Sequence, residues 1–383
     1  MRLVVLEPQC SGHHEEYLKA LLAEISNYFS ELILLTSSEC ADRFQGLIEN
    51  RVLVRKMPKF IIGSCKSKNV IVRTIGSVVM LLYTYFYVKR VKGTELFLPY
   101  FDSLVIAFAL VRRLFKSWKV VATIHHAPTK KLKQTFLDRS FMNSNLTMVV
   151  HSERIREKIR RNLSEDHGKR VLSVDYPSFQ IQEPVGCHVD RLTQKFFSKK
   201  SVPIMLYFGG LRYDKGIDIL FRALRKVNRN VEVRVVGSED YFTEKYILKE
   251  ANAIGSLDKG VVIKPKISYV SDEEKVQNFL DADFIVLPYR KMFSGQSGPL
   301  VEGIAHGCIP IVPNIDILAS VVENLGAGLV YEAEDPNSLA QAIVRGIDEL
   351  EVHKKAIQSN LCKFLYKHSL KKFCDKYIRI LKI

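Results

Sequence analysis

The 383-residue sequence lacks the cysteine patterns typical of metal sites and thiol redox centres. Its seven cysteines are an odd number, are widely spaced and form no Cys-x-x-Cys pair. We therefore expect them to be reduced, as in a cytoplasmic protein. They are Cys10, Cys40, Cys65, Cys187, Cys308, Cys362 and Cys374.

Long apolar runs are also missing. The apolar start at Met1–Val5 meets Glu7 and Pro8 at once, too early for the apolar region of a signal peptide, so we expect no export. The run Ile75–Val88 has about 14 residues, short of the roughly 20 that a spanning helix needs. It is predicted to be a core helix. The alternative is a membrane-surface segment, which the basic stretch Arg51–Lys68 beside it supports.

Acidic residues are scarce in the first half of the chain. Residues 51–100 hold ten Lys or Arg and one acid, Glu95, while residues 111–140 hold eight and one acid, Asp138. With a net charge of +16, this bias favours an anionic partner. No zinc-finger, RNP-type or helix-turn-helix pattern accompanies it, so we expect an anionic membrane surface and no nucleic acid. The expected location is the cytoplasm, peripheral on the inner face of the plasma membrane.

Short apolar strands alternate with helices along the chain, which predicts an α/β fold. We expect an N-terminal domain at residues 1–185, a C-terminal domain at 200–360 and a last helix at 361–383 that returns to the N-terminal domain. The polar and basic residues between the domains predict a linker. Each domain should be a doubly wound, Rossmann-like parallel sheet, with ligands beyond the carboxyl ends of the strands in a central cleft. No strand is followed by Gly-x-Gly-x-x-Gly, which disfavours nicotinamide chemistry.

The expected elements follow the apolar pattern. In the first domain they are strands at Arg2–Leu6, Glu31–Thr36, Leu96–Pro99, Val120–Ile124 and Met148–His151, with a helix at about His14–Phe29. In the second domain the expected strands are Pro203–Phe208, Glu232–Val236, Val261–Ile263, Phe284–Pro288 and Ile309–Pro313. The expected helices between them are Gly216–Val227, Tyr241–Ile254, Asp272–Asp281 and Gly298–Gly307.

The segment FGGLRYDKG joins an expected strand to an expected helix in the second domain. Gly209 and Gly210 allow the backbone to approach a ligand closely. Arg212 and Lys215 lie in the turn, where two cations can meet a diphosphate, and Arg can bind phosphate oxygens bidentately. Taken alone, the segment fits a solvated surface turn equally well.

The segment LPYRKMFSGQSGPLVEGIAHGCIPIV places a loop rich in Gly and Ser before a short helix. The backbone amides of Ser297 and Gly298 at the start of that helix form an anion site. Glu302 lies about one turn further in, where its carboxylate can accept hydrogen bonds from a ribose. Its neighbours predict a buried helix, in which an acid without a partner is costly, so a solvent-facing Glu302 is disfavoured.

The first domain offers two polar groups after its expected strands. Ser11 and Gly12 follow the first strand, where backbone can pack against a bound sugar or phosphate. His125 and His126 follow the strand Val120–Ile124, where a histidine can bind a sugar hydroxyl or stabilise developing charge. One histidine of the pair can equally be structural.

With these motifs in place, the second domain resembles the family 4 glycosyltransferases, which have the GT-B fold. The resemblance covers about residues 200–350 and is looser in the first domain. It rests on Phe208–Leu220, Ser268–Ser271 and Glu302–Pro310, and in the first domain on Ser11, Gly12, His125 and Val149–Ser152.

The resemblance implies a role for each matched residue. Arg212 and Lys215 would hold the donor diphosphate and neutralise the leaving group, and His125 would contact the transferred sugar. The remaining implied contacts are Glu302 with the ribose, Val270 with the base, and Ser297, Gly298, Pro299 and Leu300 with the phosphates. The transfer would retain the anomeric configuration and need no metal ion or other cofactor, since two fixed cations can replace a divalent ion at the departing diphosphate.

One position departs from the family pattern, which has a second Glu eight residues before the late one. Here that position is Ser294, so the donor sugar cannot be inferred from it. The sequence thus predicts transfer of a hexose-type sugar from a UDP- or GDP-sugar to a lipid-linked or surface polysaccharide acceptor. The alternative is a weakly catalytic relative that binds nucleotide or glycan as a scaffold. The triplet Asp281, Ala282, Asp283 imitates the metal motif of another transferase fold and is interpreted as a helix end.

Overall fold

The chain forms two compact units, each described here by itself. The computed structural model describes residues 2–9, 13–44, 52–65, 67, 69–90, 94–181, 185–197 and 201–382. Unit 1 comprises residues 1–175 and 370–383, and unit 2 comprises residues 176–369. Ser11 and Gly12, two of the predicted site residues, lie outside the described residues.

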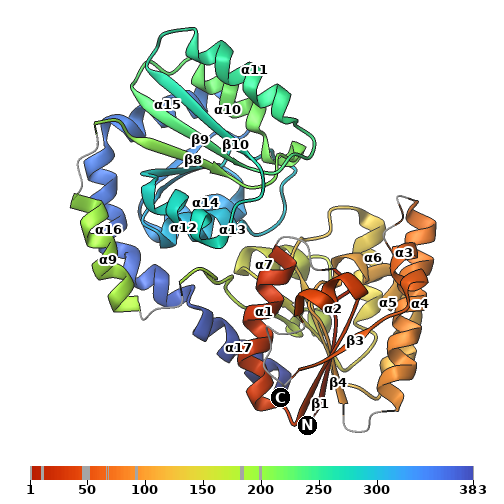
Figure 1. Cartoon of the computed structure of the whole chain (residues 1–383). Helices are drawn as coiled ribbons and strands as arrows, with labels where there is room; N and C mark the ends of the chain where they lie inside the picture. The colour runs from red at the N-terminus through yellow and green to blue at the C-terminus, as the bar shows by residue number, and fades with distance from the viewer. Residues whose placement is uncertain are drawn as a thin grey trace. The chain divides into compact units, whose positions relative to one another are not determined.

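Unit 1 is built on a seven-stranded parallel sheet with the strand order β3-β2-β1-β4-β5-β6-β7 (Figure 1). Its strands are β1 (Arg2–Leu6), β2 (Glu31–Thr36), β3 (Val52–Lys56), β4 (Thr94–Leu98), β5 (Val120–Ile124), β6 (Leu146–Val150) and β7 (Val171–Ser173). Its α-helices are α1 (His13–Ile25), α2 (Ser38–Phe44), α3 (Lys59–Cys65), α4 (Val70–Lys89), α5 (Val105–Val111), α6 (Lys131–Ser140), α7 (Glu153–Arg160), α8 (Glu165–Lys169) and α17 (Leu370–Lys382). Single 3-10 turns lie at η1 (Ser26–Tyr28), η2 (Phe101–Ser103) and η3 (Arg112–Phe115).

The last helix, α17, completes the core of unit 1 although it follows unit 2 in the sequence. Its Tyr377 hydroxyl lies 2.6 Å from that of Tyr17 on α1 and 2.8 Å from the Thr123 hydroxyl on β5. All three side chains are buried. A buried hydroxyl needs such partners, because leaving one unpaired costs about 1–3 kcal/mol.

Unit 2 is built on a six-stranded parallel sheet with the order β10-β9-β8-β11-β12-β13 (Figure 1). Its strands are β8 (Ile204–Phe208), β9 (Val231–Gly237), β10 (Val261–Ile267), β11 (Phe284–Val286), β12 (Ile309–Pro313) and β13 (Leu329–Tyr331). Its helices are α9 (Val185–Phe197), α10 (Ile217–Leu224), α11 (Glu244–Gly255), α12 (Asp272–Asp281), α13 (Gly298–Ala305), α14 (Asp316–Leu325), α15 (Pro336–Asp348) and α16 (Leu350–Lys367), with a 3-10 turn η4 (Tyr213–Lys215). The predicted α/β fold of two doubly wound parallel sheets is confirmed.

The stretch predicted as a linker is helical over most of its length. α9 packs on α16, and its Lys195 donates hydrogen bonds to the carbonyls of Phe279 (3.0 Å) and His306 (2.7 Å). The basic residues that suggested an exposed connection therefore include a cation that binds carbonyl oxygens of unit 2. The return to unit 1 begins at Leu370, because α16 ends at Lys367 within unit 2.

The expectation of reduced cysteines is wrong at one position. Cys40, buried on α2, is disulfide-bonded, and its bonding partner lies outside the described residues. The other described cysteines, Cys65, Cys187, Cys308, Cys362 and Cys374, form no disulfide. Spacing along the sequence does not reveal a pair that the fold brings together from different elements.

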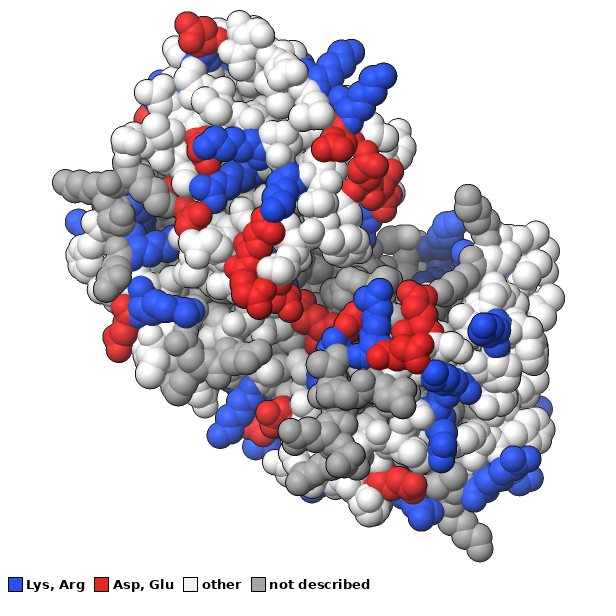
Figure 2. All heavy atoms as spheres, viewed as in Figure 1, with Lys and Arg blue, Asp and Glu red and all other residues white. Residues whose placement is uncertain are grey.

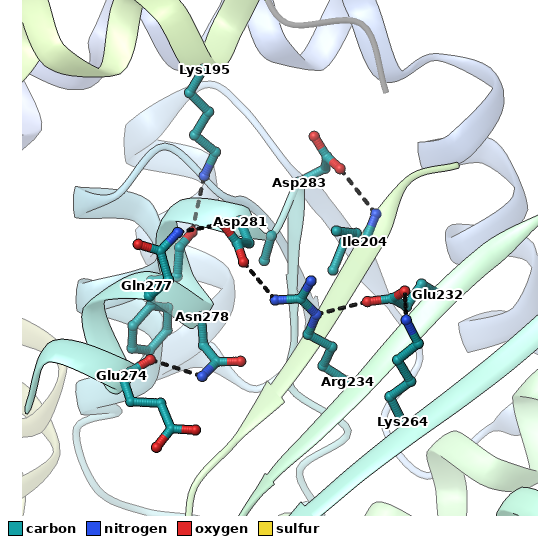
Figure 3. Close-up of polar contacts among 12 residues, drawn as sticks. Lys195, Ile204, Glu232, Arg234, Lys264, Glu274, Gln277, Asn278, Asp281 and Asp283 are labelled. Carbon is teal, nitrogen blue, oxygen red and sulfur yellow. Dashed lines mark hydrogen bonds and ion pairs between the residues drawn. The ribbon is translucent and has the colours of Figure 1, made fainter. Parts of the chain in front are cut away.

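The acidic triplet Asp281, Ala282, Asp283 belongs to the amino edge of the unit 2 sheet (Figure 3). Asp281 ends α12 and accepts a hydrogen bond from Arg234 (2.8 Å), while Asp283 accepts one from the backbone amide of Ile204 (2.9 Å). Both carboxylates therefore hold elements of the sheet together. Among the described residues, no group of three or more His, Cys, Asp or Glu side chains is placed to hold a metal ion.

Candidate functional site

The carboxyl edge of the unit 2 sheet begins with a close approach between the ends of β8 and β9. The amide of Gly209 donates to the Val236 carbonyl (2.9 Å), and the amide of Leu211 donates to that of Ser238 (2.9 Å). A Cβ on Gly237 would lie 2.0 Å from the Gly209 carbonyl oxygen, so position 237 accepts glycine alone. Gly209 has φ +121°, a conformation that side chains disfavour. The backbone rather than side chains thus forms this part of the edge.

The turn that carries the predicted cations is anchored to the loop after β11. Gly216 has φ +60°, and a Cβ there would lie 2.1 Å from the Pro288 carbonyl oxygen. Arg290 in that loop binds both carboxylate oxygens of Asp218 (2.8 and 2.9 Å) and the Tyr213 carbonyl (2.9 Å). Its side chain is buried, and such bidentate pairs fix geometry well. The two loops therefore form one rigid corner.

Lys215 is the cation at the centre of this corner. Its Nζ would lie 2.6 Å from a Cβ on Gly209, and it sits 5.6 Å from the centroid of the Tyr289 ring. The side chain is half-buried and makes no hydrogen bond or ion pair with any residue that the structure describes. The charge of Lys215 helps to lower the pKa of Asp214, but Asp214 is held by Arg212, so the Nζ of Lys215 keeps its donors for an anion.

Arg212, the second predicted cation, is paired within its own turn. Its Nε and Nη2 donate to the two carboxylate oxygens of Asp214 (2.9 and 2.5 Å). These hydrogen bonds raise the pKa of Arg212. Burial acts to raise the pKa of Asp214, but the hydrogen bonds and charge of Arg212 together lower it below its ordinary value. The Nη1 donors remain on the other side of the guanidinium, so Arg212 can bind a phosphate oxygen while it keeps Asp214.

The start of α13 lies beside Lys215. Ser297 caps the helix, accepting a hydrogen bond from the Leu300 amide (3.3 Å), and its hydroxyl lies 3.2 Å from that of Tyr289. Pro299 packs near the same point, since its Cγ would lie 3.9 Å from a Cβ on Gly209. The structure thus brings Lys215 and the α13 start together through Tyr289.

Only part of the predicted phosphate cradle on α13 can donate. Pro299 has no N–H, and the Leu300 amide is bound by Ser297. The amides of Ser297 and Gly298 remain as the donors of this helix start. Of the four residues that the resemblance assigns to the phosphates, Ser297 and Gly298 can therefore contribute their amides, and that assignment stays a prediction.

Glu302 is buried, as predicted, but its carboxylate has partners within the chain. It accepts hydrogen bonds from the Ser178 hydroxyl (2.6 Å) and from the Phe179 amide (2.8 Å). The segment that contributes these donors belongs to unit 2 and lies beside α13, since a Cβ on Gly298 would lie 3.8 Å from the Tyr176 ring. In this structure Glu302 therefore ties the first residues of unit 2 to α13.

The other predicted site residues of unit 2 lie along the same edge of the sheet, and they make no hydrogen bond with Lys215 or Arg290. Val270 is half-buried in the connection after β10, and Ser294 is half-buried in the loop before α13. A Cβ on Gly210 would meet Ser238 Oγ at an ordinary 3.7 Å, so the constrained glycine is Gly209. Close to Ser294, the buried Oε1 of Gln296 has no hydrogen-bond partner among the described residues.

His125 and His126 differ sharply in exposure. His125 is buried, with its Nε2 3.0 Å from the Pro99 carbonyl and its ring stacked on Tyr100 at 4.2 Å. His126 is exposed. The backbone amides of both residues donate to Asp102 (2.9 Å each). His125 is thus held as a core histidine of unit 1, and His126 is the one of the pair that reaches solvent.

Sequence reasoning missed the residues that organise the corner. Tyr289 and Arg290 are far from the FGGLRYDKG segment in sequence, Asp218 follows it by two residues but was assigned no role, and Gly237 ends an ordinary strand. A glycine at the end of a parallel strand next to the Gly-Gly segment was the one available signal.

The comparisons with known proteins agree with this geometry. Residues 202–349 match the family model described as glycosyl transferases group 1. The whole of this match lies within unit 2. The predicted glycosyltransferase activity is thereby confirmed at this level. No curated protein matches the sequence.

Solved structures with the same fold cover the whole chain at low identity. A glycosyltransferase from Rickettsia africae has a TM-score of 0.73 and 16% identity, over 100% of this chain and 97% of that one. Anabaena HepE in complex with UDP-glucose has a TM-score of 0.70 and 12% identity, over 100% of this chain and 99% of that one. The α,α-trehalose 6-phosphate synthase of Burkholderia multivorans has a TM-score of 0.73 and 11% identity, over 99% of this chain and 98% of that one. At these identities the likeness shows the fold, and it confirms the GT-B prediction.

Proposed function

We propose that the protein transfers a hexose-type sugar from a UDP- or GDP-sugar, and that the donor diphosphate binds at the corner formed by Lys215, Arg212 and the start of α13. The observation that carries the proposal is Lys215, a half-buried cation that makes no hydrogen bond or ion pair with any described residue. The glycine backbone beside it leaves room for phosphate oxygens. The complex of Anabaena HepE with UDP-glucose supports a donor of this kind.

In the proposed reaction these groups act on the leaving diphosphate. The bond between the anomeric carbon and the diphosphate oxygen breaks, and the developing negative charge is met by Lys215, by the Nη1 side of Arg212 and by the Ser297 and Gly298 amides. Removing one fixed donor from such a site lowers the rate by roughly 100-fold or more. This arrangement would allow transfer without a metal ion, with retention of anomeric configuration as the family resemblance implies.

We further propose a lipid-linked or surface polysaccharide acceptor and a peripheral location on the cytoplasmic face of a membrane. The scarcity of acid in residues 51–100 and 111–140 supports this part. Donor identity is left open by Ser294, which stands where the family pattern has a Glu.

Lys215→Ala tests the diphosphate site. We expect nucleotide release, measured against a panel of UDP- and GDP-sugars, to fall by about 100-fold with unchanged thermal stability. Lys245→Ala on α11 is the matched control, because Lys245 is exposed and makes no ion pair with any described residue. Undiminished release from Lys215→Ala would refute the assignment. A protein that binds nucleotide sugar in calorimetry but releases no nucleotide with any donor would instead be the scaffold considered as the alternative.

A further inference from the structure

The outer face of α4 in unit 1 is apolar and exposed. Ile71, Ile75, Val79 and Phe86 follow one face of the helix, and α3, which packs on α4, exposes Phe60. Their exposed fractions run from 36% for Val79 to 73% for Phe60. We call these five residues the apolar ridge. Contiguous exposed apolar surface of this kind marks an interaction site.

The ridge is fixed in place by close packing behind it. Residues on the opposite face of α4 are buried, among them Met80, Leu81 and Val88. A Cβ on Gly76 would lie 2.8 Å from the backbone carbon of Ser64, so α3 and α4 touch backbone to backbone. The exposed side chains therefore cannot turn inward without breaking this contact.

By its length and composition α4 could cross a membrane, and 28% of its most apolar stretch is buried in the protein. It lies between β3 and β4, and β4 pairs with both β1 and β5 inside the sheet of unit 1. Crossing a bilayer would pull that strand out of the sheet and would place the buried Ser77 and Thr84 in lipid. The helix thus suits a membrane surface rather than a membrane span.

The charges around the ridge have one sign. α3 and α4 contain no Asp or Glu, and the bases Lys59, Arg73 and Lys89 are exposed, with Arg90 directly after the helix. Figure 2 shows the flank over α3 and α4, at the right of the view, as white and blue. An anionic leaflet attracts each base close to it, and a neutral protein partner would not provide this attraction.

The amino end of α4 reaches the carboxyl edge of the unit 1 sheet. Burial lowers the pKa of Lys133 on α6, Asp102 acts to raise it, and the charge of Arg73 lowers it further, so these groups are near one another. Asp102 binds the backbone amide of the exposed His126 at that edge. Arg73, two residues after Ile71, lies on the side of α4 opposite the ridge, near Lys133 of α6.

We propose that the apolar ridge enters the headgroup and acyl boundary of an anionic lipid leaflet, with Lys59, Lys89 and Arg90 on lipid phosphates. This holds unit 1 on the membrane with its carboxyl edge next to the leaflet, where a lipid-linked acceptor would present its phosphate and sugar. The surface deepens the acceptor part of the proposed function, but its membrane contact does not depend on transfer.

Sedimentation of the full chain with vesicles tests the proposal. The vesicles are phosphatidylcholine alone or mixed with phosphatidylglycerol, and no nucleotide sugar is added. We expect the wild type to sediment with the anionic vesicles, and Phe60→Ser, Ile71→Ser, Ile75→Ser together to lower the partition at least tenfold. The matched control carries Leu248→Ser, Val262→Ser and Val352→Ser, three exposed apolar residues of unit 2, and should sediment as the wild type does. Thermal midpoints of both variants should equal that of the wild type.

Charge is tested separately with Lys59→Gln and Lys89→Gln together, which should reduce sedimentation with anionic vesicles by about tenfold. Wild-type protein that stays in solution with both vesicle types would overturn the proposal, as would a ridge variant that sediments like the wild type. A wild type that is dimeric and does not sediment, with a monomeric ridge variant, would show a contact between copies and also overturn it. Binding by a protein that releases no nucleotide would uphold the membrane surface and refute transfer alone.

Discussion

The carboxyl edges of the two sheets occupy the same place in the topology. Glycine backbone forms the edge in unit 2, whereas aromatic side chains fill it in unit 1. In unit 2 the edge is backbone at Gly209 and Gly237 with Lys215 above it. In unit 1 the corresponding edge is filled with rings, since Tyr100 is stacked between His14 (3.5 Å) and His125 (4.2 Å). An edge of glycines leaves room for a ligand and a cation to meet it, whereas stacked rings use the same space for packing. Fold position alone therefore does not identify a binding edge.

The largest effect is expected where the glycine edge is filled. Gly209→Ala would place a Cβ 2.6 Å from Lys215 Nζ at a φ of +121°, which would displace the lysine and strain the backbone. We expect nucleotide release to fall by about 100-fold and stability by about 1–2 kcal/mol. Gly210→Ala is the comparison, because its Cβ has ordinary room, and we expect less than a tenfold change. Equal effects of the two alanines would contradict the special role of Gly209.

Substitutions at the ring-filled edge of unit 1 should lower the free energy of unfolding. His125→Ala removes a buried ring that stacks on Tyr100 and pairs with the Pro99 carbonyl, so we expect a loss of about 2–4 kcal/mol in the unfolding of unit 1. His126→Ala should change stability by no more than about 0.5 kcal/mol, because that side chain is exposed. Urea unfolding followed with nucleotide release separates the roles. An intact stability with abolished transfer in His125→Ala would restore it as a catalytic residue.

A third variant tests the buried carboxylate of unit 2. Glu302→Gln leaves one oxygen to accept from both Ser178 and Phe179, or turns an N–H toward one of them. We expect a loss of about 1–3 kcal/mol in chemical denaturation. Ser178→Ala removes the hydroxyl donor alone and should have the smaller effect, about 1 kcal/mol. If Glu302→Gln left stability unchanged and only weakened donor binding, the ribose would be its main partner.

The smallest expected effect is a pH dependence shared by the two units. Burial lowers the pKa of His151 in unit 1 to about 4 and that of His306 in unit 2 to about 3. In the unfolded chain both titrate near 6.5, so their neutral forms contribute fully above that pH and lose the contribution as the pH falls toward the folded values. Each histidine should cost about 1.4 kcal/mol of stability per pH unit in this window.

Denaturation at pH 7 and pH 5.5 measures that slope. His151→Asn should flatten it for unit 1 only, and His306→Asn for unit 2 only, because each histidine lies within one unit. A slope that neither substitution changes would assign the acid sensitivity to other groups.

Local patterns predicted ten of the thirteen described strands and the glycine turn, because apolar alternation and Gly conformations act over a few residues. The strands β3, β7 and β13 were missed. Partners that come from distant segments were not predictable in the same way. The donors to Glu302 lie more than a hundred residues earlier, and the ring that supports Lys215 is Tyr289 in another loop. The segment Ile75–Val88 shows the same limit. Its apolarity favoured a core helix, while the packing of α3 at Gly76 decides which face is exposed.

The docking of α17 on unit 1 also sets an order of folding. Unit 2 is contiguous over residues 176–369, so its sheet can form as soon as that stretch has left the ribosome. All the described strands of unit 1 precede residue 174 in the sequence. The hydrogen bonds of Tyr17 and Thr123 to Tyr377, however, require the last helix. During synthesis unit 2 can therefore fold before unit 1 is complete. The core of unit 1 is completed only when residues 370–382 have been synthesised and α17 has docked.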